Sequence, residues 1–172
     1  GEDRYETAGA ISTKGVENSE KAFLAYAHDF PDALSISSYA GAEGIPLLLT
    51  DKEEIPEATL EALTSLGVQE VTLIGGESVI TQSVQSQLED LSYQVDRLAG
   101  DNRYGTNMAI LNSLPFNKEI VYVATGVSFP DALAGAALGA KSNSPIFLVP
   151  EKNINSEGLS YVNDRRDEGS FF

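Results

Sequence analysis

Apolar residues along the chain follow two spacings. Short strand-like runs, typical of strands buried in a parallel sheet, fall at residues 21–27, 45–50, 70–74, 93–98, 120–125 and 145–149. Helical spacing is clearest at 56–66. Further helices are expected after Asp3, from 30 to about 42, from 81 to 91, after Asn102, and from 129 to about 140. Strands that alternate with helices predict βαβ units, each a mostly parallel sheet flanked by helices.

Several helix boundaries follow from capping residues. Asp3 precedes the first helical segment and has Glu6 three residues later, which is the spacing of a capping box. Asn102 stands in the same place before a later helix. The other expected cap and first-turn residues are Asp29, Pro31, Ser128 and Pro130, with Gly67 at a helix end.

The chain contains an internal repeat. Residues 1–11 read GEDRYETAGAI and residues 100–110 read GDNRYGTNMAI, an offset of 99 that also superimposes the two FPDAL segments at 30–34 and 129–133. Aligned at this offset without gaps, residues 1–73 and 100–172 share 18 identities, which makes chance similarity an inadequate explanation. We therefore expect a first unit at 1–99. A second at 100–172 is truncated before the counterpart of the Gly75-Gly76 turn.

Composition narrows the classes of function. The chain has 172 residues, 42% of them hydrophobic, and a net charge of -15. This acidity argues against binding nucleic acid or an anionic membrane through bulk charge. The absence of cysteine excludes disulfides and thiolate metal sites, and a single histidine leaves little for zinc or iron, so no metal or cofactor is expected. No apolar run approaches the roughly 18 residues of a membrane span, and residues 1–20 do not read as a signal peptide.

Taken together, the motifs resemble a known family. The G-x-x-R-Y-x-T start, the F-P-D-A-L helix opening, the P-x-x-L strand, the I-G-G turn and the returning R-L-A-G-x-x-R-Y are similar to the cell wall binding repeat 2 family of Gram-positive surface proteins. The resemblance implies tandem Rossmann-like or Toprim-like α/β units, usually three. It also implies an extracellular location and non-covalent attachment to the cell wall, in clostridia through an anionic secondary wall polymer. Catalysis is expected on a separate domain, so this chain is not expected to be an enzyme.

The Arg-Tyr-x-Thr motifs are the first candidate ligand-binding residues. A guanidinium presents a fork of N–H donors to phosphate or carboxylate, and a tyrosine ring stacks on a sugar. The alternative is that the arginine pairs with an acid between units and the tyrosine only packs. Arg97, six residues before the second motif, would add to a local positive site. These candidates are Arg4, Tyr5, Thr7, Arg97, Arg103, Tyr104 and Thr106.

Asp32 and Asp131 of the two FPDAL segments are the second candidates. At the carboxyl edge of a sheet, either carboxylate could accept hydrogen bonds from sugar hydroxyls or help to bind a cation. The alternative is an acid favoured by the free N–H groups of a first helical turn.

Two other features favour a structural interpretation. Gly75-Gly76 could receive an anion, but Glu77 follows directly and would repel phosphate, so a turn that needs positive φ is the favoured reading. His28 ends a strand, yet its counterpart is Val127, which favours a histidine at the surface or rim.

The predicted function is therefore that of a binding module for an anionic wall glycopolymer. The alternatives are a nucleotide- or phosphate-binding α/β enzyme domain, and a repeat scaffold with no ligand of its own. Packing with a further repeat, or self-association, is also expected.

Overall fold

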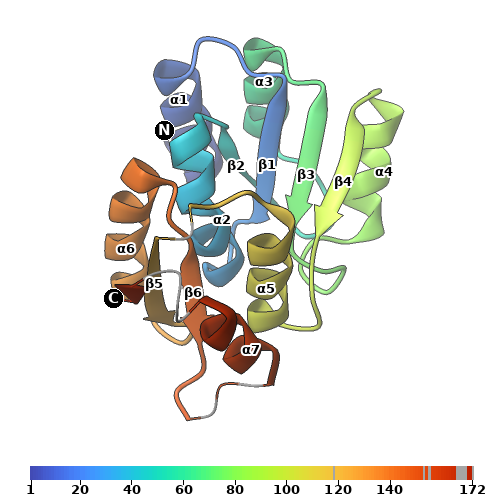
Figure 1. The fold of residues 1–172 in the computed structure, drawn as a ribbon. Helices are drawn as coiled ribbons and strands as arrows, with labels where there is room; N and C mark the ends of the chain where they lie inside the picture. The colour runs from blue at the N-terminus through green and yellow to red at the C-terminus, as the bar shows by residue number, and fades with distance from the viewer. Residues whose placement is uncertain (118, 153, 155, 166–169, 172) are drawn as a thin grey trace. The chain divides into compact units, whose positions relative to one another are not determined.

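The computed structural model describes residues 1–117, 119–152, 154, 156–165 and 170–171, and it has the predicted α/β architecture (Figure 1). The helices are α1 (Arg4–Gly15), α2 (Pro31–Glu43), α3 (Glu57–Leu66), α4 (Gln82–Asp90), α5 (Arg103–Ser113), α6 (Phe129–Ser142) and α7 (Ser156–Arg165). The strands are β1 (Lys21–Tyr26), β2 (Leu47–Thr50), β3 (Glu70–Ile74), β4 (Gln94–Leu98), β5 (Ile120–Thr125), β6 (Ile146–Val149) and β7 (Ser170–Phe171). Within this described part of the chain, every helix is too short or too polar to cross a membrane.

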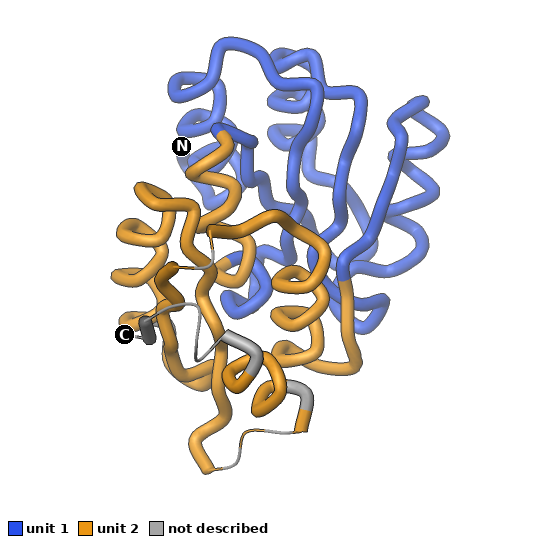
Figure 2. Tube along the Cα trace, in the orientation of Figure 1, with its two compact units in different colours: residues 1–33, 44–98 blue, residues 34–43, 99–172 orange. Residues whose placement is uncertain are grey.

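The chain forms two compact units (Figure 2). Unit 1 comprises residues 1–33 and 44–98, and unit 2 comprises residues 34–43 and 99–172. Most of α2 therefore groups with unit 2, although it lies within the first repeat of the sequence.

Unit 1 is built on a four-stranded parallel sheet in the order β2-β1-β3-β4. Helices α1 and α3 pack against each other and against β2, while α4 packs along β4. The core is fully apolar: Leu24, Leu48, Leu63, Leu73, Ile80, Val84 and Leu88 have no measurable exposure. All four strands run in one direction, so their carboxyl ends share one edge, where ligands of α/β proteins usually bind.

Unit 2 repeats this plan. Its parallel sheet has the order β6-β5-β7, with α5 packed on β6 and α6 on β5 and β6. Tyr122 pairs with Ile146, just as Phe23 pairs with Leu47 in unit 1, and both partners differ by the offset of 99. The repeat in the sequence is thus a repeat in the register of strand pairs.

Local sequence signals account for most of the helix ends. The Asp3 carboxylate accepts the Glu6 N–H at 2.8 Å, and Asn102 Oδ1 accepts two N–H groups of its helix, so both predicted N-caps are confirmed. Gly67 ends α3 with φ 73°, as predicted. Helix α2 begins at Pro31, however, so the prediction of Asp29 as its N-cap is wrong by one residue; Asp29 Oδ1 instead accepts the Phe30 N–H.

Within unit 2, α2 and α6 approach closely. A Cβ added at Gly41 would lie 2.9 Å from Ala140 Cβ, and one at Gly139 would lie 2.9 Å from Ser38 Cβ. Tyr39 packs edge-on against Phe116, with 5.3 Å between ring centroids. The small residues predicted to permit close helix packing therefore bring a helix of the first repeat against a helix of the second.

Candidate functional site

Arg4 lies at the first position of α1 and reaches the end of β1. Its Nη1 donates to the carbonyl oxygen of Ala27 at 2.6 Å and lies 3.4 Å from Nδ1 of His28. The side chain is exposed. Its structural partner is therefore a backbone carbonyl of its own unit.

Arg103 makes the equivalent contact in unit 2. Its Nη1 donates to the carbonyl oxygen of Gly126 at 2.7 Å, and Gly126 is the offset-99 counterpart of Ala27. Gly126 also lies under the Tyr104 ring, since an added Cβ would be 2.5 Å from Cε1. A glycine is needed at this position for the tyrosine to lie flat against the strand end.

The carboxyl edge of the first sheet gathers a polar cluster around His28. The Tyr5 hydroxyl lies 3.2 Å from His28 Nε2, and Asp51 Oδ1 lies 3.8 Å from the same nitrogen. Burial raises the pKa of the Tyr5 hydroxyl, and the negative charge and hydrogen bond of Asp51 raise it further. We call Arg4, Tyr5, His28 and Asp51 the β1-end cluster.

The two motif threonines differ in their surroundings. Thr7 is exposed, and its hydroxyl donates to the carbonyl oxygen of Asp3 at 2.6 Å. Thr106 is only 2% exposed, and its hydroxyl accepts the Gly100 N–H at 3.2 Å. Thr106 therefore faces protein and not solvent.

Arg97 binds the turn after β3. Its Nη1 donates to the carbonyl oxygens of Gly75 and Ile80, each at 2.9 Å, and Nη2 lies 3.4 Å from Gln85 Oε1. Burial lowers the pKa of this guanidinium, an effect that the nearby Glu77 charge opposes. Arg97 belongs to unit 1 and Arg103 to unit 2, and the contacts of each lie within its own unit.

The Gly75 turn is structural in the way the sequence predicted. Gly75 has φ 123°, and an added Cβ would lie 2.7 Å from Asp32 Oδ2 and 2.8 Å from Val79 Cγ2. A half-buried carboxylate thus occupies the side of the turn where a phosphate would have to approach.

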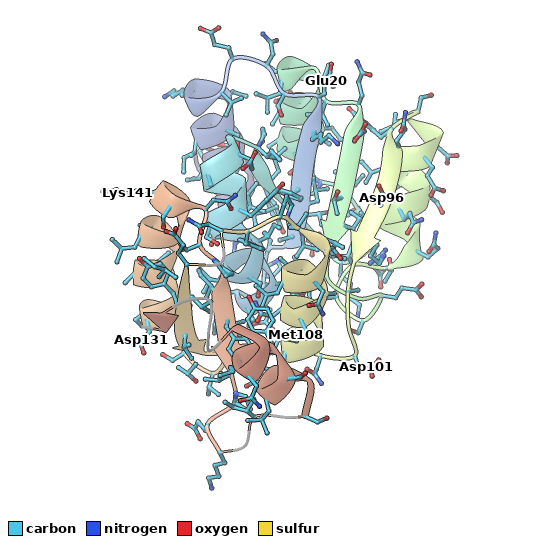
Figure 3. All side chains as sticks on the ribbon, in the orientation of Figure 1. Glu20, Asp96, Asp101, Met108, Asp131 and Lys141 are labelled. Atoms are coloured by element: carbon cyan, nitrogen blue, oxygen red, sulfur yellow. The ribbon has the colours of Figure 1, made fainter. Side chains whose placement is uncertain are left out.

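Asp131, the counterpart of Asp32, is exposed in the first turn of α6 (Figure 3). The offset of 99 puts the counterpart of Gly75 at position 174, beyond the last residue of the chain. The two aspartates therefore have different surroundings.

An open cleft of about 850 Å³ lies beside the β1-end cluster, between the segment after β2 and the start of α4. Its wall carries four carboxylates, from Asp51, Glu53, Glu54 and Glu77, against one ammonium group, from Lys52. The cleft repels anions. Among the described residues, no three His, Asp or Glu side chains come together as a metal-binding set.

His28 and Asp51 are the members of the β1-end cluster that sequence reasoning missed. Tyr26 and Thr50 are paired in register at the ends of β1 and β2, so the residues that follow these strands meet at the sheet edge. That parallel pairing was the available signal. The repeat comparison concealed it, because the counterparts of His28 and Asp51 are Val127 and Pro150.

Two α/β units built on one repeat, each with the same arginine-to-carbonyl contact, define a tandem-repeat α/β module. The chain belongs to the cell wall binding domain 2 (CWB2) family, which matches residues 1–85 and 97–166. It is therefore a binding module of the kind found in cell surface proteins, and membership implies a location at the cell surface. This confirms the resemblance drawn from the motifs.

Named relatives agree with this assignment. The chain is 31% identical over 165 residues to the N-acetylmuramoyl-L-alanine amidase LytC of Bacillus subtilis, covering 96% of this chain and 32% of LytC. It is also 31% identical to the amidase enhancer of the same organism, covering 96% of this chain and 22% of the enhancer. Cwp6 from Clostridium difficile has the same fold, with a TM-score of 0.87 at 25% identity over 96% of this chain and 27% of Cwp6. The chain thus spans a third or less of the length of these relatives.

Proposed function

We propose that the chain holds a surface protein to the cell wall non-covalently by binding an anionic secondary wall polymer, with any catalysis on a separate part of the protein. The observation that carries this proposal is the exposed guanidinium of Arg4, held at the carboxyl edge of the first sheet by its bond to Ala27. That bond uses Nη1, and a guanidinium has five N–H donors. The remaining donors give an anionic group a fixed partner.

Charge favours a short-range contact. At a net charge of -15, the protein repels a polyanion at long range. The Debye length at physiological ionic strength is about 8 Å, so the repulsion is screened beyond the immediate contact. Arg4, with the Tyr5 and His28 rings beside it, would then act on one phosphate or carboxylate of the polymer. Arg103 and Tyr104 would contribute the equivalent contact from unit 2.

The other candidates take lesser parts in this proposal. Thr7 and the exposed Asp131 are available to sugar hydroxyls. Arg97, Thr106 and Asp32 would act on the binding edge indirectly, by holding the backbone around it.

The test is co-sedimentation of the protein with purified cell walls, before and after chemical removal of secondary polymers. We expect binding to intact walls and loss of binding to stripped walls. Equal binding to both preparations would show that the polymer is not the ligand.

Arg4→Gln and its matched control Lys14→Gln test the role of the guanidinium. Both change the net charge from -15 to -16, and both residues are exposed at opposite ends of α1. We expect Arg4→Gln to weaken wall binding and Lys14→Gln to leave it unchanged. Equal effects of the two substitutions would reduce the role of Arg4 to bulk charge.

A further inference from the structure

A small pocket lies at the carboxyl edge of the second sheet, within unit 2. It has a volume of about 200 Å³ and is bounded by the start of α5, the end of β6 and the segment that follows β6. This volume is below the roughly 300–1,000 Å³ of pockets for drug-sized ligands. It suits one substituent or one sugar ring.

The pocket has an apolar floor. Met108 and Phe147 are 3% and 2% exposed, and both line it (Figure 3 labels Met108). Pro150 and Ile154 line it nearer to solvent, since both retain exposed surface. None of the lining residues is charged, in a chain in which 22% of residues are. An ion would lose its hydration without gaining a partner, so a ligand must be neutral and partly apolar.

One polar side chain at this pocket has a fixed role. Asn102 Oδ1 accepts the N–H groups of Tyr104 and Gly105 at 3.0 and 3.2 Å. With that oxygen engaged, the Nδ2 amide is the group that Asn102 can offer to a ligand, and it is a donor. A neutral group that combines a carbonyl acceptor with a methyl group matches this donor beside an apolar floor.

The same place in unit 1 has different chemistry. At the offset of 99, Gly9 stands for Met108 and Asp51 stands for Pro150. Unit 1 thus has the charged β1-end cluster where unit 2 has an uncharged pocket. The two units therefore select different groups.

We propose that this pocket of unit 2 binds the acetamido group of an N-acetylated amino sugar, with the methyl group against Met108 and Phe147 and the carbonyl oxygen toward Asn102. This inference rests on the proposed function, because it supplies a second contact for the wall polymer beside the anionic one.

Met108 is the single methionine of the chain, so it reports on the pocket directly. Protein with a ¹³C-labelled methionine methyl group gives one resonance, to be followed during titration with N-acetylglucosamine, glucosamine and glucose. We expect a saturable shift with N-acetylglucosamine only. No shift with it, or equal shifts with all three sugars, overturns the inference.

Pro150→Asp places the residue of the first repeat in the second. We expect this variant to bind N-acetylglucosamine at least tenfold more weakly, because a carboxylate enters the apolar wall. The matched control is Leu138→Asp, which adds the same charge at a 53% exposed position of α6 away from the pocket, and it is expected to bind normally. Equal weakening in both variants also counts against the pocket.

Wall co-sedimentation separates this inference from the proposed function. A silent Met108 signal with normal polymer-dependent wall binding removes the pocket and leaves the polymer. A specific Met108 shift with equal binding to stripped walls does the reverse.

Discussion

Arg4 Nη1 lies 2.6 Å from the carbonyl oxygen of Ala27, which ties the first turn of α1 to the end of β1. The same contact recurs 99 residues later between Arg103 and Gly126, at 2.7 Å. A charged donor on a strand-end carbonyl holds the helix start against the sheet edge. The arginine of the motif is therefore part of the scaffold of each unit as well as a candidate for ligand contact.

Loss of this contact should destabilise unit 2 more than unit 1. Arg103 is half-buried, so Arg103→Gln leaves a carbonyl without its charged donor, and we expect the free energy of unfolding to fall by about 1.5–3 kcal/mol. Arg4 is exposed and water can replace it, so Arg4→Gln should cost about 1 kcal/mol or less. Urea denaturation followed by circular dichroism measures both. A larger loss for Arg4→Gln would contradict the ranking.

Gly75→Ala should be strongly destabilising. A φ of 123° is unfavourable for alanine, and the new methyl group would meet Asp32 and Val79, so we expect a loss of about 2 kcal/mol or more. Gly15→Ala is the control, because nothing lies within 4 Å of its added Cβ, and it should be neutral or slightly stabilising. Asp32→Ala in the Gly75→Ala background should recover only part of the loss, because it relieves one contact and leaves the backbone strain. Full recovery would show that the strain is negligible.

Tyr5 should give the protein an alkaline instability. Its pKa is raised in the folded state, mainly by burial and then by Asp51, so the folded protein keeps a proton that the unfolded chain releases near pH 10. Its contribution to stability is thus complete below pH 10 and is lost as pH rises through the raised pKa. Thermal unfolding of wild type and Tyr5→Phe between pH 8 and 11 should diverge only above pH 10, with the variant less sensitive to pH. Parallel curves over this range would contradict the role of Tyr5.

The exposed leucines of α6 should drive association. Leu133 and Leu138 are 56% and 53% exposed, whereas Leu34, the α2 counterpart of Leu133, is 8% exposed. Apolar side chains that are covered in one repeat and exposed in the other indicate a surface for a further repeat or a second copy. We expect concentration-dependent association in light scattering, abolished by the double substitution Leu133→Glu and Leu138→Glu. Ile11→Glu, at a 68% exposed position of α1, is the control. A wild-type protein that stays monomeric at high concentration would contradict this expectation.

Periodicity and capping residues predicted most of the fold. The runs at 70–74 and 120–125 are strands with those bounds, and Asp3, Asn102 and Gly67 end helices as expected. These features depend on neighbouring residues, so local sequence determines them. The order β2-β1-β3-β4 depends on long-range packing and was not readable.

The site was less predictable for a physical reason. A sequence names side chains, so acidic partners and phosphates were the natural expectations for Arg4 and Arg103. Their observed protein acceptors are backbone carbonyls, which every residue has. His28 and Asp51 are 23 residues apart and meet only because β1 and β2 are parallel neighbours.

The division of α2 at Ala33 has a practical meaning for anyone who wishes to move these repeats between proteins. The stretch that was duplicated and the stretch that becomes compact are out of phase by one helix. Cutting at residue 99 would separate the helix that holds Ser38 and Gly41 from the α6 residues that it packs against. A transplanted single repeat would leave that surface bare, so grafts should be made in pairs or with Ser38 and its neighbours redesigned for water.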